Sequence, residues 1–228
     1  MILVGTDMPT TRILLFAKAP IPGQTKTRLI PALGAVGAAR LHAQLLRATM
    51  ERLASGLHGP IDARLELWCA PNTAHPLFQE LAATHGIDLR EQSDGDLGDR
   101  LLAGCRDALR RADGVVLIGS DCPGLGPAQL AQALAALQAP EVDAVLGPAL
   151  DGGYVLLGLR RAESALFTEM PWGGDRVAEI TRQRLAALGW YWQELPALRD
   201  VDRPEDLDWL GAQAPWCKMS SSTSLEPK

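Results

Sequence analysis

The sequence predicts an α/β protein with a single Rossmann-like domain, in which a mainly parallel central sheet is flanked by helices. Three observations lead to this prediction. Strand-like and helix-like segments alternate along most of the chain, as in successive βαβ units. The continuous apolar run at 114–119 is typical of a central strand buried on both faces. A length of 228 residues suits one such core, so we expect one domain at 1–211.

The strands are predicted from short apolar or alternating segments that lie between turn residues. The alternation of apolar and polar residues at 63–68, for example, predicts a half-buried strand. In chain order, the strands are expected at 12–17, 63–68, 87–90, 114–119, 143–147, 151–159 and 190–195.

The helices are predicted from apolar residues at helical spacing and from the proline and glycine residues at helix ends. Leu41, Leu46, Met50 and Leu53 recur at this spacing before Gly56, a residue suited to a helix end. In chain order, the first helix is expected between the loop 18–31 and Gly56, and the others at 73–84, 99–112, 127–137, 175–188 and 204–210. The serine-rich segment 212–228 has too little apolar surface to order itself, so we expect a disordered tail.

The composition disfavours several classes of protein. A net charge of -5 repels a phosphate backbone, so nucleic acid is not an expected partner. No uninterrupted apolar run reaches the roughly 18 to 20 residues that cross a bilayer, and no export signal is recognisable, so membrane insertion is not expected. The 4 cysteines lack zinc-site spacing and fit thiols kept reduced, which predicts a cytoplasmic protein.

A cationic loop follows the first predicted strand. Lys18, Lys26 and Arg28 are interleaved with Pro20 and Gly23. Ligands of open α/β sheets collect at the carboxyl ends of strands, where such a loop can bring ammonium and backbone N–H groups to nucleotide phosphates. The alternative is a solvated loop whose charges serve solubility. A P-loop is disfavoured, because the glycine before the lysine of that motif is absent here.

Three aspartates are candidates for a metal site. Asp121 ends the most hydrophobic strand, where an acid is well placed to hold a divalent cation against a diphosphate. Asp200 and Asp202 bracket one valine, so an extended backbone would put both on the same face. Mg²⁺ or Mn²⁺ needs only one or two carboxylates, because water and phosphate complete its coordination. The alternative for Asp121 and Asp202 is capping of the helix that follows each.

A second glycine-containing segment contains Asp151, Gly152, Gly153 and Tyr154. From its spacing it is a hairpin turn, although its glycines would also allow a substrate to approach the backbone. The histidines show no ligand-type spacing, and no serine lies in a nucleophile-elbow motif. Hydrolytic triads and histidine metal sites are therefore disfavoured.

These motifs, taken in order, resemble the DUF2064 or arsenosugar-biosynthesis-type glycosyltransferase family, whose members have the GT-A fold of nucleotide-diphospho-sugar transferases. The resemblance rests on five segments that span nearly the whole predicted domain, namely 16–29, 95–100, 119–123, 147–154 and 200–202. Ser120 stands where the family pattern has threonine, and the segment that begins at Trp172 is looser than the family pattern. The resemblance implies a metal-dependent enzyme that transfers a sugar from a nucleotide-diphospho-sugar to a small-molecule acceptor.

The resemblance also implies roles for individual residues. Catalytic roles fall to Lys26, Asp121 and Asp151, and metal binding falls to Asp121 and Asp202. Nucleotide binding is expected from Lys18, Pro20, Gly23, Lys26, Arg28, Asp96, Arg100 and Ser120. Substrate binding is expected from Gly152, Gly153, Tyr154 and Trp172.

Two other functions remain open at this stage. The family is similar in fold to guanylyltransferases that use a nucleoside triphosphate and a phosphorylated acceptor, so nucleotidyl transfer is the main alternative. A non-catalytic nucleotide-binding protein is the other. The acids expected around the pocket suit sugar hydroxyls, and this favours the less charged nucleotide-sugar as donor.

Overall fold

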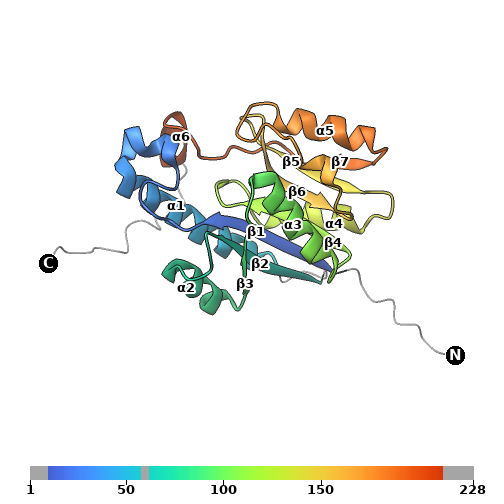
Figure 1. Cartoon of the computed structure of the whole chain (residues 1–228), viewed down its shortest axis with the longest axis horizontal. Helices are drawn as coiled ribbons and strands as arrows, with labels where there is room; N and C mark the ends of the chain where they lie inside the picture. The colour runs from blue at the N-terminus through green and yellow to red at the C-terminus, as the bar shows by residue number, and fades with distance from the viewer. Residues whose placement is uncertain (1–9, 58–61, 213–228) are drawn as a thin grey trace.

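The computed structural model describes residues 10–57 and 62–212, so nearly all of the expected tail lies outside the described residues. Within them, a seven-stranded sheet has the order β3-β2-β1-β4-β6-β5-β7 (Figure 1). Strand β6 is antiparallel to β4 and β5, and the other pairs are parallel, which confirms the mainly parallel sheet. The strands are β1 (Thr11–Lys18), β2 (Ala63–Ala70), β3 (Asp88–Glu91), β4 (Gly114–Gly119), β5 (Ala144–Pro148), β6 (Tyr154–Leu159) and β7 (Trp192–Glu194).

Helices cover both faces of the sheet and form a three-layer arrangement (Figure 1). Helices α1, α2 and α4 pack on one face, and α3 and α5 pack on the other. Their bounds, with those of α6, are α1 (Ile30–Ser55), α2 (Pro76–His85), α3 (Leu97–Leu109), α4 (Pro127–Gln138), α5 (Val177–Ala187) and α6 (Glu205–Ala212). Short 3-10 helices occur at Thr27–Leu29 and Ser164–Leu166.

Strand β4 is central in the sheet, as its continuous apolar run predicts. Its side chains alternate between the two cores. Val116 and Ile118 pack with the α1, α2 and α4 side, and Val115 and Leu117 pack with the α3 and α5 side. Both cores need apolar residues from this strand, and therefore the sequence lacks the alternation of a half-exposed strand.

The prediction of a half-buried β2 is wrong. Its residues from Leu65 to Ala70 are all buried, and Glu66 has a relative exposure of only 1%. The Glu66 carboxylate is compensated by Arg111, whose Nη1 lies 2.7 Å from Oε1, and by Arg12 at 3.5 Å. Because a buried carboxylate can be held by cations from distant elements, polarity at this position does not indicate exposure.

Helix α1 begins at Ile30, close to the predicted end of the preceding loop at Pro31, and its C-cap residue is Gly56, as predicted. Gly34, with φ 70° and ψ 164°, interrupts its helical geometry near the start. By length and composition alone, the segment Thr27–Ser55 passes the test for a helix that could cross a membrane. Core helices pass the same test, and Leu45 and Leu53 of α1 are fully buried.

A small third core lies beside α1 and α6. It joins Leu29 and Leu45 to Val201 and Leu210, all of them buried. Burial of Val201 fixes the segment between β7 and α6 near the carboxyl end of β4, where the Val201 N–H donates to the Asp121 carbonyl at 2.9 Å. Two segments that are 80 positions apart in the sequence thus meet at one edge of the sheet.

Candidate active site

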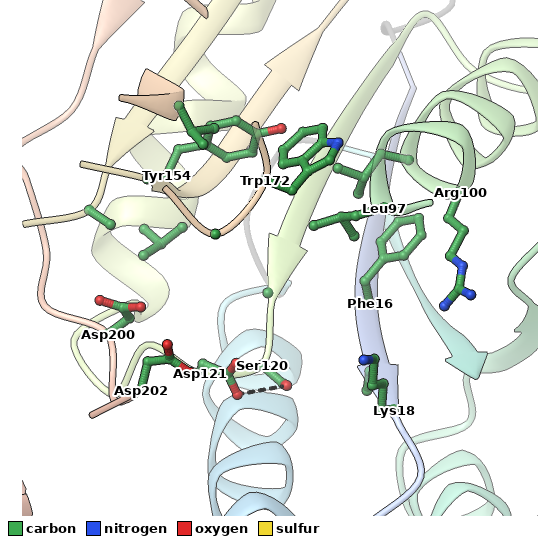
Figure 2. Close-up of a pocket in the computed structure, with 18 of the residues that line it drawn as sticks. Phe16, Lys18, Leu97, Arg100, Ser120, Asp121, Tyr154, Trp172, Asp200 and Asp202 are labelled. Carbon is green, nitrogen blue, oxygen red and sulfur yellow. Dashed lines mark hydrogen bonds between the residues drawn. The ribbon is translucent and has the colours of Figure 1, made fainter. Parts of the chain in front are cut away.

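The principal cavity has a volume of about 660 Å³ and opens at the carboxyl ends of β1 and β4. This is the edge where ligands of open α/β sheets bind, and the volume is that of a small-molecule site. Figure 2 shows Asp121, Asp200 and Asp202 on one side of the cavity, with Lys18 and Arg100 on the other. Three carboxylates thus gather on one side of the cavity, and two cations lie on the opposite side.

Lys26 lies on the acidic side of the cavity. Its Nζ donates to the Val201 carbonyl at 2.5 Å and lies 2.8 Å from Asp121 Oδ2 and 3.8 Å from Asp202 Oδ1. The backbone of Lys26 is left-handed, with φ 48° and ψ 44°, and only 3% of its side chain is exposed. The predicted phosphate-binding lysine is thus enclosed by oxygen atoms of the protein.

Asp121 follows β4 and faces the cavity with 40% of its side chain exposed. Burial alone would raise the pKa of this carboxyl, but the Lys26 ammonium, aided by His42, holds the pKa far below its ordinary value. Asp121 is therefore ionised at neutral pH. It does not cap the next helix, because the N-cap residue of α4 is Gly126.

His42 is a site residue that the sequence analysis missed. Its Nε2 lies 2.8 Å from the Lys18 carbonyl oxygen, so this nitrogen carries the proton and donates it. Its Nδ1 faces Asp121 Oδ1 at 3.7 Å. The spacing of the histidines did not indicate this role. The feature that could have indicated it is the position of His42 on the buried face of a long helix, which passes beneath the ends of two strands.

Asp202 is bound by a second cation of the loop that follows β1. The Nη1 of Arg28 donates to Asp202 Oδ2 at 2.6 Å, and Nη2 donates to the Gly173 carbonyl at 3.4 Å. Asp202 does not cap α6 with its side chain. Asp206 Oδ2 instead accepts from the backbone N–H groups of Asp202 and Arg203.

Asp200 lines the same cavity as Asp202, as the spacing across buried Val201 predicts. Burial raises the pKa of Asp200 to about 6, and the neighbouring carboxylate of Asp151 adds to this shift. A hydrogen bond from its own backbone N–H and the charge of Lys26 act against this shift, but they do not cancel it. Asp200 is therefore a hydrogen-bond acceptor in the cavity. The sequence analysis considered it only as the residue that shares a face with Asp202.

The start of α3 forms the opposite wall. Asp96 is the N-cap of α3 and exchanges hydrogen bonds with Asp99, since each carboxylate accepts from the backbone N–H of the other residue. Arg100 donates through Nε to the Gly95 carbonyl at 3.1 Å. Gln92 also lines this wall, and its Nε2 donates to the carbonyls of Ala17 and Trp68. The carboxylate of Asp96 is engaged in the cap, whereas Arg100 makes no ion pair with any described residue.

The segment from Asp151 forms the expected hairpin turn between β5 and β6. Asp151 Oδ1 accepts from the Gly153 N–H at 2.8 Å, and both residues line the cavity. Gly152 does not line it. With φ 92°, Gly152 packs against the Asp175 backbone, where an added Cβ would lie 1.9 Å from the carbonyl oxygen. Gly152 therefore lets the turn pack against the backbone of Asp175, and not against a substrate as the sequence suggested.

Aromatic side chains form the inner wall of the cavity (Figure 2). Tyr154 and Trp172 pack edge to face with centroids 6.2 Å apart, and Phe16 stacks on Trp68 at 5.6 Å. Trp172 approaches the first turn of α3, where a Cβ at Gly98 would lie 3.0 Å from Trp172 Nε1. The wall can therefore contact the face of a ring or a sugar.

Most of the predicted site residues meet at this cavity. Pro20, Gly23 and Gly152 do not line it. The residues that do are Lys18, Lys26, Arg28, Asp96, Arg100, Ser120, Asp121, Asp151, Gly153, Tyr154, Trp172 and Asp202.

Among the described residues, no group of three or more His, Cys, Asp or Glu side chains is arranged to hold a metal ion. Asp121 and Asp202 nevertheless direct oxygen atoms at one cation, the Lys26 ammonium, together with the Val201 carbonyl. Carboxylate and carbonyl oxygens are hard donors that suit Mg²⁺ or Mn²⁺, and phosphate and water complete such sites. The donor set therefore fits a divalent cation.

The fold and the position of the cavity define a Rossmann-like α/β protein with a ligand site at the carboxyl ends of its central strands. Residues 57–174 match the family described as "Uncharacterized protein conserved in bacteria (DUF2064)". The chain belongs to this family, as its motifs predicted. No curated protein matches the chain.

Solved structures support the fold. A protein from Desulfovibrio desulfuricans G20, described as a candidate nucleotide-diphospho-sugar transferase, has a TM-score of 0.77 and 31% identity over 93% of this chain and 89% of that chain. The 4-diphosphocytidyl-2C-methyl-D-erythritol synthase of Anaerococcus prevotii DSM 20548 has a TM-score of 0.59 at 10% identity, over 91% of this chain and 99% of that chain.

A third structure is glucosyl-3-phosphoglycerate synthase from Mycobacterium tuberculosis, in complex with Mn²⁺, UDP and glucosyl-3-phosphoglycerate. It has a TM-score of 0.53 and 14% identity, over 91% of this chain and 76% of that chain. At this identity the likeness shows the fold alone. The predicted nucleotide-diphospho-sugar transferase fold is confirmed.

Proposed function

We propose that the protein is a transferase that uses a nucleotide-diphospho-sugar as donor, a small-molecule acceptor, and Mg²⁺ or Mn²⁺. The observation that carries this proposal is the cavity itself, which combines the cations Lys18 and Arg100, neither ion-paired with a described residue, with a cluster of carboxylates around Lys26 and an aromatic inner wall. A donor of this class has an anionic diphosphate, a planar base and a hydroxyl-rich sugar. The name of the Desulfovibrio desulfuricans relative supports the same class.

The nucleotide would bind to the loop after β1 and to the start of α3. Lys18 is exposed and makes no ion pair with a described residue, and Arg100 lies on the same side of the cavity (Figure 2). These two cations would meet the diphosphate first. Lys26 and Arg28 would join them, and the first turn of α3 would contact the base or ribose.

Asp121 and Asp202 would hold the divalent cation, with the Val201 carbonyl beside them. The cation would supply positive charge to the departing nucleoside diphosphate. His42 would orient Asp121 by its position between that carboxylate and the Lys18 carbonyl.

The acceptor would bind beside β6 and the aromatic wall, where Gly153, Tyr154 and Trp172 line the cavity. Asp151 is exposed there, and it is the group that would accept a proton from an incoming hydroxyl if transfer inverts the anomeric centre. A reaction that retains configuration would not need this role.

The charge of the cavity favours a nucleotide-sugar over a nucleoside triphosphate. Its lining contains Lys18, Lys26, Arg28 and Arg100, but also Asp96, Asp121, Asp151, Asp200 and Asp202. A triphosphate would bring additional negative charge to a lining that is already acidic on balance. Carboxylates are better suited to accept hydrogen bonds from sugar hydroxyls.

Nucleotidyl transfer is the second candidate, and the likeness in fold to the Anaerococcus prevotii synthase favours it. Here a phosphorylated acceptor would attack the α-phosphate of a nucleoside triphosphate. The same cations would stabilise the charge that develops on that phosphate.

One assay separates these candidates. The protein is incubated with Mg²⁺ or Mn²⁺, a pool of acceptors, and either nucleotide-sugars or nucleoside triphosphates. We expect release of nucleoside diphosphate from a nucleotide-sugar. Pyrophosphate released from a triphosphate, with no turnover of any nucleotide-sugar, would favour nucleotidyl transfer. Nucleotide binding without turnover of either donor would favour a non-catalytic protein.

We place this activity in the cytoplasm as part of the same proposal. Cys69, Cys105 and Cys122 are free and buried, which suits a reducing compartment. Cell fractionation with an antibody to the chain tests this location.

A further inference from the structure

The Lys26 ammonium is held in a cage of protein oxygen atoms at the carboxyl end of β4. The cage consists of the Val201 carbonyl at 2.5 Å, Asp121 Oδ2 at 2.8 Å and Asp202 Oδ1 at 3.8 Å. Two of these oxygens are within hydrogen-bond distance of the ammonium, and Asp202 Oδ1 adds an ion-pair contact. With 3% of its side chain exposed, Lys26 is a buried cation of the site.

The same oxygen atoms are those that the proposed function assigns to a divalent cation. An ammonium group and a dication cannot share them, because the two would repel each other at contact distance. Any metal that binds Asp121 and Asp202 must therefore take the position of Lys26. The Lys26 ammonium therefore competes with a metal ion for the same oxygen atoms.

We infer that Lys26 blocks the metal position in the ligand-free protein and leaves it when phosphate is bound, so that metal binding depends on the nucleotide. This inference rests on the proposed metal site. Lys26 lies on the cavity wall, and Lys18 and Arg100 attract phosphate to the other side of the same cavity. A bound phosphate offers the ammonium new oxygen partners as the metal takes the old ones.

The backbone around Lys26 is held by buried neighbours. Lys26 has left-handed geometry, which is costly for a residue with a Cβ and is maintained only by surrounding contacts. The loop is anchored on both sides of Lys26, because Thr25 and Leu29 are buried. Thr27 and Arg28, in contrast, are exposed. A rotation of the lysine side chain therefore needs no movement of the core.

Mn²⁺ binding without nucleotide is the first test, with free Mn²⁺ measured by electron paramagnetic resonance. Wild type is compared with Lys26→Met and with Lys18→Met, a matched control that removes the same charge from the end of β1, at the same cavity. We expect Lys26→Met to bind Mn²⁺ roughly tenfold more tightly than wild type or better. We expect a far smaller gain for Lys18→Met, which removes only a longer-range repulsion.

Lys26→Gln is the second variant, and circular dichroism verifies that each variant is folded. The added change Asp121→Asn in the Lys26→Met background should abolish the gain in affinity. Equal Mn²⁺ affinity in wild type and in folded Lys26→Met or Lys26→Gln would overturn the inference, as would the absence of Mn²⁺ binding from all of them.

Amine labelling of the wild-type protein provides an independent readout. Lys18 and Lys26 are the lysines of the described residues, and mass spectrometry distinguishes them. We expect Lys26 to resist acetylation by a water-soluble ester and to become reactive in saturating Mg²⁺ with inorganic pyrophosphate. Lys18 reports any general effect of the ligands. Unchanged Lys26 labelling under conditions in which Mn²⁺ binds would contradict the inference.

These outcomes are separable from failure of the proposed function. If nucleotide-sugar turnover needs Mn²⁺ but Lys26→Met binds Mn²⁺ no better than wild type, the function stands and the blocking role of Lys26 fails. If Mn²⁺ competes with Lys26 but neither donor is turned over, the inference stands and the proposed reaction fails.

Discussion

Arg28 and Asp202 lie 174 positions apart in the sequence, yet Arg28 Nη1 donates to Asp202 Oδ2 at 2.6 Å. The pair connects the loop after β1 to the segment between β7 and α6. Through Gly173, Arg28 also contacts the segment that carries Trp172. One guanidinium thus joins three segments at the edge of the cavity.

Arg28→Gln is expected to change activity more than stability. The side chains of Arg28 and Asp202 are 48% and 31% exposed, and solvent-exposed pairs contribute about 0 to 1 kcal/mol to the free energy of unfolding. Loss of a phosphate-binding cation should instead raise the donor KM about tenfold or more. Urea unfolding and donor titration measure the two effects. Arg203→Gln, at an exposed arginine of the same region, is the control and should change neither quantity.

The fold could be predicted well because its strands carry strong local signals. Strand β4 has the same bounds in the sequence analysis and in the structure. The first turns of α1 carry a weaker signal, because Ile30 to Gly37 contain two glycines and a proline that weaken helical propensity, and the interruption at Gly34 could not be predicted. Packing of Leu29 and Leu41 in the third core determines the conformation there.

From physical reasoning alone, the candidate site is most evident where strand ends carry charged residues, and the family resemblance supplied most of the others. Asp121 and Lys18 follow this rule. His42 does not, since its place beside Asp121 depends on how α1 crosses under the sheet. Nor could the sequence predict that Lys26 would face Asp121 and Asp202, because that contact requires three segments to converge.

His42→Ala should disturb both Asp121 and the end of β1. It removes the N–H group that donates a hydrogen bond to the Lys18 carbonyl. A buried carbonyl left without a donor lowers the free energy of unfolding by about 1–3 kcal/mol. The turnover rate should fall as well, because the Asp121 carboxylate loses the imidazole proposed to orient it. His42→Gln keeps a donor and should recover part of both losses. Chemical unfolding and kcat measure them.

His85→Ala is the control for His42, because the His85 side chain makes no hydrogen bond with a described residue. Its unfolding free energy should change by no more than about 0.5 kcal/mol. If His42→Ala behaves like His85→Ala in both measurements, His42 has no positioning role.

Asp200 should make stability depend on pH. Its pKa is about 6 in the folded protein against 3.8 for the free side chain, so the folded state binds the proton more tightly. The folded state therefore favours the protonated carboxyl, and the free energy of unfolding falls as the pH rises from about 4 to about 6. Asp200→Asn should therefore raise Tm by roughly 2 to 6 °C at pH 7.5 in EDTA, and this gain should vanish near pH 4.

Asp94→Asn is the control for Asp200, since Asp94 is an exposed acid near the same cavity. Calorimetric scans of both variants over the same pH range test the prediction. A Tm gain for Asp200→Asn that persists unchanged at pH 4 would show that the carboxylate charge is not its cause.

Glu66 provides a test of the fold far from the proposed metal position. Its carboxylate is 1% exposed and lies 2.7, 3.5 and 3.9 Å from nitrogen atoms of Arg111, Arg12 and Arg90. Trp68 Nε1 donates to it at 3.2 Å. These groups come from β1, β2, β3 and the residues after α3, so one buried anion connects four parts of the chain.

Glu66→Ala should lower the free energy of unfolding by about 3–5 kcal/mol, because it leaves three guanidinium groups close together without their shared anion. Glu66→Gln keeps hydrogen-bond acceptors but not the charge, so its loss should be intermediate. Glu80→Ala is the matched control, since it breaks an ion pair with Arg47 at the surface, where 51% of the Glu80 side chain is exposed. Its cost should stay below about 1 kcal/mol. Urea unfolding compares the three variants with wild type, and equal midpoints for Glu66→Ala and Glu80→Ala would mean that Glu66 does not hold these elements together.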